Sequence, residues 1–217
     1  GIYNRLGYNP FNVANDQIVG VDGQLNPNAE VIYKSLNWYD ALDQIGTRTN
    51  HSVNIASGGD NHKVFFSTSY LEEEGYVITS KFDRLTTRVN ADFDINKRLS
   101  IGGSANISIS ESKGPPSRGG SIANPFGFAK NMGSIYPVYM NDLEGNLILD
   151  AAGNPIWDVG EGDFALNQGS RPNSPGRHAI AEAVLNDELN RDNTYGFRYY
   201  AAFNIMDGLN LRLNYGR

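Results

Sequence analysis

Hydrophobic and polar residues alternate along the middle of the chain. Between residues 84 and 95 the odd positions are mostly apolar and the even positions polar, and the pattern resumes over 99–110. Side chains of a β-strand point alternately to opposite faces, so a period of two predicts amphipathic strands. Each run is about twice the usual strand length, and at a tilt near 45° it would cross about 28 Å. Because that is the hydrocarbon thickness of a bilayer, the pattern indicates a membrane β-barrel.

The remaining strands and their connections follow the same plan. Further strands are predicted at 51–57, 62–71, 193–205 and 209–215. Gly, Asn and Asp residues at 58–61, 96–98 and 206–208 predict tight hairpin turns, whereas the connections over 72–83 and 111–192 are long. Outer-membrane barrels alternate short periplasmic turns with long extracellular loops in this way. The one predicted helix, at 179–190, rests on the spacing of apolar residues inside the longest connection.

The strand directions that follow from this alternation place aromatic residues at two levels. Tyr70 and Tyr195 are expected near the outer membrane interface, and Phe93 and Phe203 near the inner one. Aromatic girdles at both interfaces are typical of membrane barrels. A soluble β-sandwich is the competing interpretation, because its core also holds aromatic rings. The even positions of 99–110 favour the barrel, because they are Ser, Asn and Gly with no charge, which suits a crowded lumen.

Composition and charge narrow the class of protein. Apolar residues make up 40% of the chain and charged residues 19%, and no stretch approaches the apolar length of a transmembrane helix. A formal net charge of -6 argues against nucleic-acid binding, since no basic stripe exists to neutralise phosphates. The absence of cysteine removes disulfides and thiolate metal sites. Six strands are too few to close a barrel, so we expect the chain to be a segment of a longer protein.

Several short motifs, in a fixed order, resemble one family of outer-membrane proteins. The motifs are WYD at 38–40, NHSVNI at 50–55, SGG at 57–59, STSYLEEEGYV at 67–77, DR at 83–84 and RVN at 88–90, followed by IYPVY at 135–139, DLEG at 142–145, GN at 153–154 and DVG at 158–160. Together they are similar to the first barrel region and a long loop of the SusC/RagA-type TonB-dependent transporters of the Bacteroidota. The resemblance extends from about Gly7 to the end of the chain.

The resemblance implies an architecture and a set of partners. The complete protein would be a barrel of about 22 strands with a plugged lumen in the bacterial outer membrane. It would import a large nutrient, with oligosaccharide as the leading cargo and peptide as the other, and it would act with a SusD-like surface lipoprotein. TonB would engage a part of the protein that this chain does not contain. No cofactor and no enzymatic activity are expected.

The pattern and the resemblance together predict four segments. Residues 1–50 are expected to form an extracellular loop region after the first barrel strand, and residues 51–112 to form transmembrane strands. Residues 113–192 are expected to form a long extracellular loop, and residues 193–217 further transmembrane strands. The predicted fold class is therefore all-β, a partial antiparallel transmembrane barrel with long extracellular loops.

Candidate ligand-binding residues are aromatic and lie in the predicted loops. Trp38, Tyr39 and Trp157 are the named candidates, because exposed rings can stack on sugars. The competing interpretation is that these rings, with Phe126, Phe128, Tyr136 and Tyr139, pack the loops together. Arginines at 118, 171 and 177 are weaker candidates, for acidic cargo.

Metal and catalytic chemistry find little support in the sequence. Asp142 and Asp150 each begin an Asp-x-x-Gly-Asn segment, eight residues apart, which predicts a pair of turns in preference to a calcium loop. The three histidines lack zinc-ligand spacing, and Glu161 and Asp163 are not placed as a catalytic carboxylate pair by any pattern. Two other functions stay open: an adhesion or structural barrel in the outer membrane, and a soluble carbohydrate-binding β-domain.

Overall fold

A computed structural model describes residues 9–33, 37–115, 124–142, 144–161, 170–185 and 188–217 of the chain. The chain divides into two compact units. The sheet unit comprises Ile45–Lys113 and Glu188–Arg217, and the loop unit comprises Gly1–Gln44 and Gly114–Asp187. Each unit is described separately below.

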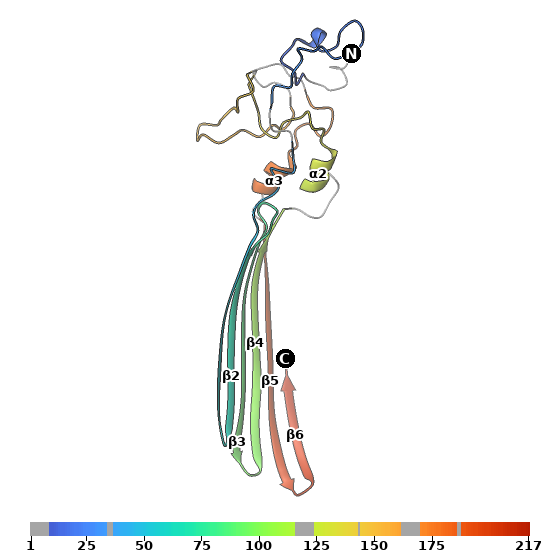
Figure 1. Ribbon diagram of the computed structural model, residues 1–217. Helices are drawn as coiled ribbons and strands as arrows, with labels where there is room; N and C mark the ends of the chain where they lie inside the picture. Colours follow the sequence, from blue (N-terminus) through green and yellow to red (C-terminus); the bar gives the residue numbers. More distant parts are fainter. Residues whose placement is uncertain (1–8, 34–36, 116–123, 143, 162–169, 186–187) are drawn as a thin grey trace. The chain divides into compact units, whose positions relative to one another are not determined.

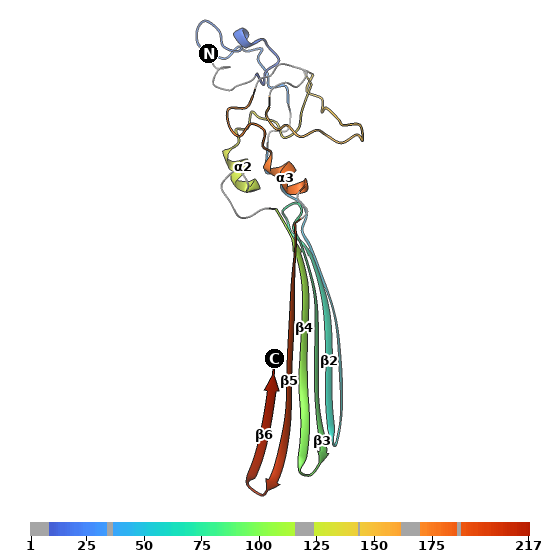
Figure 2. The same ribbon diagram turned by 180° about the vertical axis from the view of Figure 1, so that it is seen from behind.

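The sheet unit is one antiparallel sheet in which every strand pairs with its neighbours in sequence. Figure 1 shows β2 to β6 side by side in chain order, and Figure 2 shows the same order from behind. The strands are β1 (Thr47–Gly59), β2 (His62–Glu74), β3 (Lys81–Asn96), β4 (Leu99–Lys113), β5 (Leu189–Met206) and β6 (Leu209–Gly216). The predicted all-β antiparallel fold class is confirmed, and all three tight turns join the strand pairs expected.

The strands are longer than predicted, mainly at one end of the sheet. β2 continues through Glu74 and β3 begins at Lys81, whereas the apolar alternation covered only 62–71 and 84–95. β4 likewise reaches Lys113, and β5 begins at Leu189. Charged residues replace apolar ones in these extensions, so the alternation no longer marks the strand although backbone pairing continues.

The helices of the loop unit are short. The predicted helix at 179–190 is found only as α3 (Ala179–Leu185), and its last part was wrong because Leu189 already belongs to β5. The sequence prediction missed α2 (Pro125–Asn131), which the Asn124 side chain caps by accepting from the Phe126 and Gly127 amides at 2.9 and 3.2 Å. A 3-10 turn covers Asn15–Gln17. Within the described residues no helix is long and apolar enough to cross a membrane.

Candidate functional site

One face of the sheet unit is apolar along the middle of its strands. The register places Ile55, Phe66, Val89, Ala105 and Phe197 in one row across β1 to β5. In the next row the Thr68 and Thr87 hydroxyls, 3.2 Å apart, form a hydrogen bond with each other. A soluble protein rarely exposes a continuous apolar surface of this kind, whereas a lipid-facing barrel wall requires one.

The apolar face ends at a row of charged residues. Glu72, Asp83, Glu111 and Arg191 lie opposite one another across β2 to β5, directly beyond the row that holds Tyr70, Leu85 and Ile109. Lys81 Nζ lies 3.2 Å from Glu72 and 3.8 Å from Asp83, and Arg191 Nε lies 2.6 Å from Glu111. Exposed ion pairs add little to stability, so this row matters mainly as the boundary of the apolar face.

The opposite face of the sheet unit is mainly polar, although Phe65 and Leu71 of β2 also lie on it. Arg88 on β3 and Asn106 on β4 lie side by side, and the guanidinium Nε donates to the amide oxygen at 2.8 Å. Inward-facing residues of a membrane barrel are polar in the same way, so we call this surface the lumen face.

A hydrogen bond on the lumen face spans three strands. The Tyr200 hydroxyl on β5 donates to the Asp92 carboxylate on β3 at 2.6 Å, across Gly102 on β4. A Cβ atom at position 102 would collide with both side chains, so this strand glycine marks a close approach. The Arg212 guanidinium carbon lies 3.9 Å from the centre of the Tyr200 ring, which gives a cation–π contact.

The core of the loop unit is an aromatic cluster around His178. Trp38 is 2% exposed, and its indole Nε1 donates to the Tyr136 carbonyl at 2.9 Å. The ring centre of Trp38 lies 5.2 Å from Phe128 and 4.8 Å from His178. On another side of the imidazole, Trp157 lies 4.9 Å away. These rings tie α2, α3 and the segment around Trp38 together.

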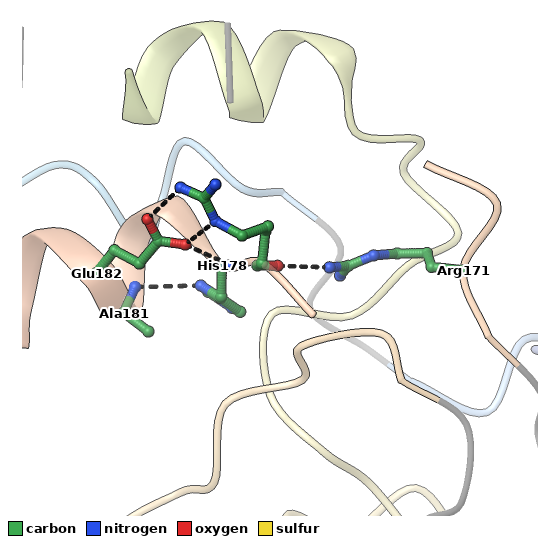
Figure 3. Close-up of polar contacts among 5 residues, drawn as sticks. Arg171, His178, Ala181 and Glu182 are labelled. Atoms are coloured by element: carbon green, nitrogen blue, oxygen red, sulfur yellow. Dashed lines mark hydrogen bonds and ion pairs between the residues drawn. The ribbon is translucent and has the colours of Figure 1, made fainter. Parts of the chain in front are cut away.

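His178 also caps α3, as Figure 3 shows. Its Nδ1 accepts from the Ala181 amide at 3.1 Å, and its Nε2 lies 2.9 Å from the Val138 carbonyl. The neutral imidazole with its proton on Nε2 satisfies both contacts. Burial, the largest cause, lowers the pKa of His178 to about 4. The histidine is therefore a neutral structural cap, 1% exposed.

Glu182 fixes the same helix start from the other side. Its carboxylate accepts from the His178 amide at 3.3 Å and receives two hydrogen bonds of 2.6 Å from Arg177. The Arg177 hydrogen bond is the largest cause that lowers the pKa of Glu182. Two nitrogens of the Arg177 guanidinium are engaged by this bidentate pair, so the arginine stabilises the start of α3.

Arg171 holds the backbone of the loop unit together. It is 3% exposed, and its guanidinium donates to the carbonyls of Asp158 (3.2 Å), Val159 (3.0 Å), Ser174 (3.2 Å) and Arg177 (2.7 Å). Because one guanidinium donates to four carbonyls, it holds separate backbone segments close together. Arg171 is therefore not presented to an acidic cargo in this structure.

The named ligand candidates are brought partly together. Trp38 lies inside the aromatic cluster, and Trp157 is half-buried and stacks on Tyr139 with ring centres 4.7 Å apart. Tyr39 is 41% exposed. Of the other candidates, Phe128 and Tyr136 are buried, Phe126 is half-buried, and Arg118 lies outside the described residues. Of the three named candidates, Tyr39 is therefore the exposed side chain, whereas Trp157 is packed against Tyr139 and His178.

The two Asp-x-x-Gly-Asn segments form matching turns. Asp142 accepts from the amides of Glu144 (3.0 Å) and Asn146 (2.7 Å), and Asp150 accepts from those of Ala152 and Asn154, both at 2.8 Å. Hydrogen bonds from Asn146 and Asn154 to the two carboxylates are the largest causes that lower the aspartate pKa values. Over the part of the chain that is described, no group of three or more potential metal ligands occurs.

These turns close a backbone ring that the sequence analysis missed. The Met140 amide donates to Ile156, the Ile148 amide to Met140, and the Ile156 amide to Ile148, at 2.8 to 3.0 Å. The three residues are eight positions apart, and one Asp-x-x-Gly-Asn turn lies between each consecutive pair. The repeated Asp-x-x-Gly-Asn spacing was the available signal.

Comparison with known proteins identifies similar chains. No family profile matches. The chain is 27% identical to TonB-dependent receptor P3 of Formosa agariphila over 83% of its length, and 28% identical to TonB-dependent receptor P26 of that organism over 65%. Two solved structures, described as the RagAB peptide transporter and as the RagAB peptide importer in a closed-closed state, match with TM-scores of 0.59 and 0.52 at 17% and 16% identity. Each match covers 83% of this chain.

The resemblance to SusC/RagA-type transporters is confirmed. The chain spans only 16% and 13% of the two receptors and 18% of the solved transporter chains. The sheet unit therefore matches a segment of a barrel of this type. The relatives are named as receptors and transporters, and none of these names describes an enzyme.

Proposed function

We propose that this chain forms part of the wall of an outer-membrane barrel that imports a large nutrient with energy delivered by TonB. The observation that carries the proposal is the two-faced sheet, apolar on one side and polar on the other, in strands of 13 to 18 residues from β1 to β5. Strands of this length match the span of a tilted membrane strand with room to spare.

The proposal assigns the strand segments 51–112 and 193–217 to the membrane. Segments 1–50 and 113–192 would then form the extracellular mouth. A SusD-like surface lipoprotein, which the resemblance to SusC/RagA-type transporters implies, is the proposed lid over this mouth. The proposed cargo is an oligosaccharide or a peptide. Tyr39, which is 41% exposed, and the half-buried Trp157 are the side chains proposed to contact a sugar ring.

Uptake by living cells tests the proposal. Deleting the gene that encodes the full-length protein should abolish growth on one class of nutrient, tested with panels of oligosaccharides and of peptides as sole sources. Disabling TonB should reproduce the loss, and affinity purification of the full-length protein should recover a lipoprotein encoded beside it. Growth and uptake that are unchanged in the deletion strain on every nutrient would contradict import and would favour an adhesive or structural barrel.

A further inference from the structure

The connection between β2 and β3 contains a tight turn with an unusual backbone. The Ser80 amide donates to the Val77 carbonyl at 3.1 Å, which closes a β-turn with Ile78 and Thr79 at its centre. Thr79 has a φ of 65°, whereas the φ of Ile78 is negative. These signs are those of a type II turn, whose third position normally requires glycine.

Two unfavourable features coincide at Thr79. A β-branched residue is a genuine outlier at positive φ, because its Cβ atom crowds the neighbouring carbonyl oxygen. The Thr79 hydroxyl is also buried, and no residue that the structure describes forms a hydrogen bond with it. A buried hydroxyl without a partner is costly. A glycine at this position would remove both costs.

The neighbouring residues hold the turn in this conformation. The Gly75 amide donates to the Ser80 carbonyl at 2.9 Å and so joins the two ends of the connection. The two residues approach closely, because a Cβ atom on Gly75 would lie 2.8 Å from the Ser80 Cβ. Val77 is buried. Backbone strain persists only where the surroundings impose it, and such residues gather at ligand clamps and switch regions.

We propose that this connection is a two-state switch, in which the peptide between Ile78 and Thr79 rotates to give a type I turn. Type I and type II turns share the hydrogen bond that closes them, so the bond between Ser80 and Val77 is retained. The ψ of Ile78 changes from about +120° to about −30°, and Thr79 takes a negative φ. The rotation releases the strain of Thr79 and moves its hydroxyl out of the buried position.

The rotation changes which polar groups the connection presents. The Ile78 carbonyl and the Thr79 amide belong to the rotating peptide, so both exchange sides of the turn. A bound group that forms a hydrogen bond with either of them in one state only would select that state. The pairing of Glu74 with Lys81 at the ends of β2 and β3 would not change. The connection would thus respond to hydrogen bonding without any rearrangement of the sheet.

Methyl NMR of the full-length protein in lipid nanodiscs tests the switch. According to their rate of exchange, two states give the Ile78 δ1 methyl two signals, one exchange-broadened signal, or one averaged signal that moves with temperature. Ile78→Val assigns the resonance by its disappearance. Ile107, in the middle of β4, is the internal control and should give one sharp signal that does not move.

Two substitutions at position 79 separate backbone strain from the hydroxyl. Thr79→Gly should lower the population of the relaxed state by about tenfold and leave one fixed Ile78 signal, because glycine adopts positive φ freely. Thr79→Val keeps the β-branched side chain and removes the hydroxyl, so the two-state behaviour should persist.

Three results would overturn the switch. The first is a single sharp Ile78 signal that does not move with temperature in the unsubstituted protein. The second is two-state behaviour that survives in Thr79→Gly, and the third is its loss in Thr79→Val, because in either case strain at Thr79 would not be its cause. The switch rests on the turn alone, so failure of the proposed import would leave it standing.

Discussion

Several single side chains that look functional in the sequence are structural in the fold. Trp38 and Arg171 were candidates for cargo binding because aromatic and cationic residues in loops often contact ligands. Both are buried, with exposures of 2% and 3%. The burial of Trp38 could not be predicted, because its hydrogen bond joins it to Tyr136, 98 residues away. Arg171 is held by nearby carbonyls, but no pattern in the sequence shows that these backbone segments turn towards it.

The pH dependence of the loop unit should follow His178. Its pKa is about 4 in the fold and about 6.5 in an unfolded chain, so protons bind preferentially to the unfolded state. The full contribution to stability is present above pH 6.5 and is lost as the pH falls towards 4, by about 3 kcal/mol in total. Tryptophan fluorescence during unfolding can measure this, because both tryptophans of the chain contact this imidazole.

Substitution of His178 separates packing from capping. His178→Ala should lower the free energy of unfolding of the loop unit by about 2–4 kcal/mol, since both the cap and the ring contacts are lost. His178→Asn keeps a capping side chain and should recover about 1 kcal/mol of that loss. Both variants should lose the pH dependence of stability between pH 6.5 and 4. Equal losses of stability in the two variants would show that the cap contributes nothing.

Gly102 should tolerate no side chain. Gly102→Ala would displace Tyr200 and break its hydrogen bond to Asp92, at a cost of about 1–3 kcal/mol. Gly196→Ala is the control, because the nearest atom to an added Cβ there is the Asn106 carbonyl oxygen at 4.0 Å. Chemical denaturation of the folded barrel in detergent measures both, and similar stability in the two variants would contradict the close approach.

The strands themselves were largely predictable, because one apolar and one polar face impose a period of two. All six strands were located. The errors are in the strand ends, where charged residues replace the apolar ones of the lipid-facing pattern. At the charged row, side chains such as Glu72 and Arg191 form ion pairs across strands. The alternation of apolar and polar residues therefore stops there, although the strands continue. α2 was missed because it is only seven residues long, although Asn124 and Pro125 form a recognisable helix start.

Neighbouring positions on one strand should respond oppositely to charge. Ile55→Arg places a guanidinium on the apolar face of β1, and near the middle of a bilayer this costs about 2–4 kcal/mol. Asn54→Arg places the same group on the lumen face and should be tolerated. Heat-modifiable migration of the full-length protein on SDS gels gives the folded fraction, and equal assembly of the two variants would contradict the assignment of the faces.

The alternation of short turns and long loops predicts the orientation of the protein in the membrane. The sequence contains no cysteine, so single introduced thiols report accessibility. Ala151→Cys, in an exposed turn of the loop unit, should react with a membrane-impermeant maleimide on intact cells. Asp60→Cys, in the turn between β1 and β2, should react only after the outer membrane is permeabilised. The reverse pattern would invert the proposed topology.

The charged row has a mechanical consequence for such a barrel. Lys81 lies four positions beyond Leu85 on β3, and at about 3.3 Å per residue and a 45° tilt this places Lys81 about 9 Å past the apolar band. Displacement of the barrel towards the periplasm would bury the paired charges in hydrocarbon. Displacement in the opposite direction would expose the apolar row that holds Leu85 to water. In the proposed importer, the charged row would therefore oppose displacement of the wall along the membrane normal in either direction.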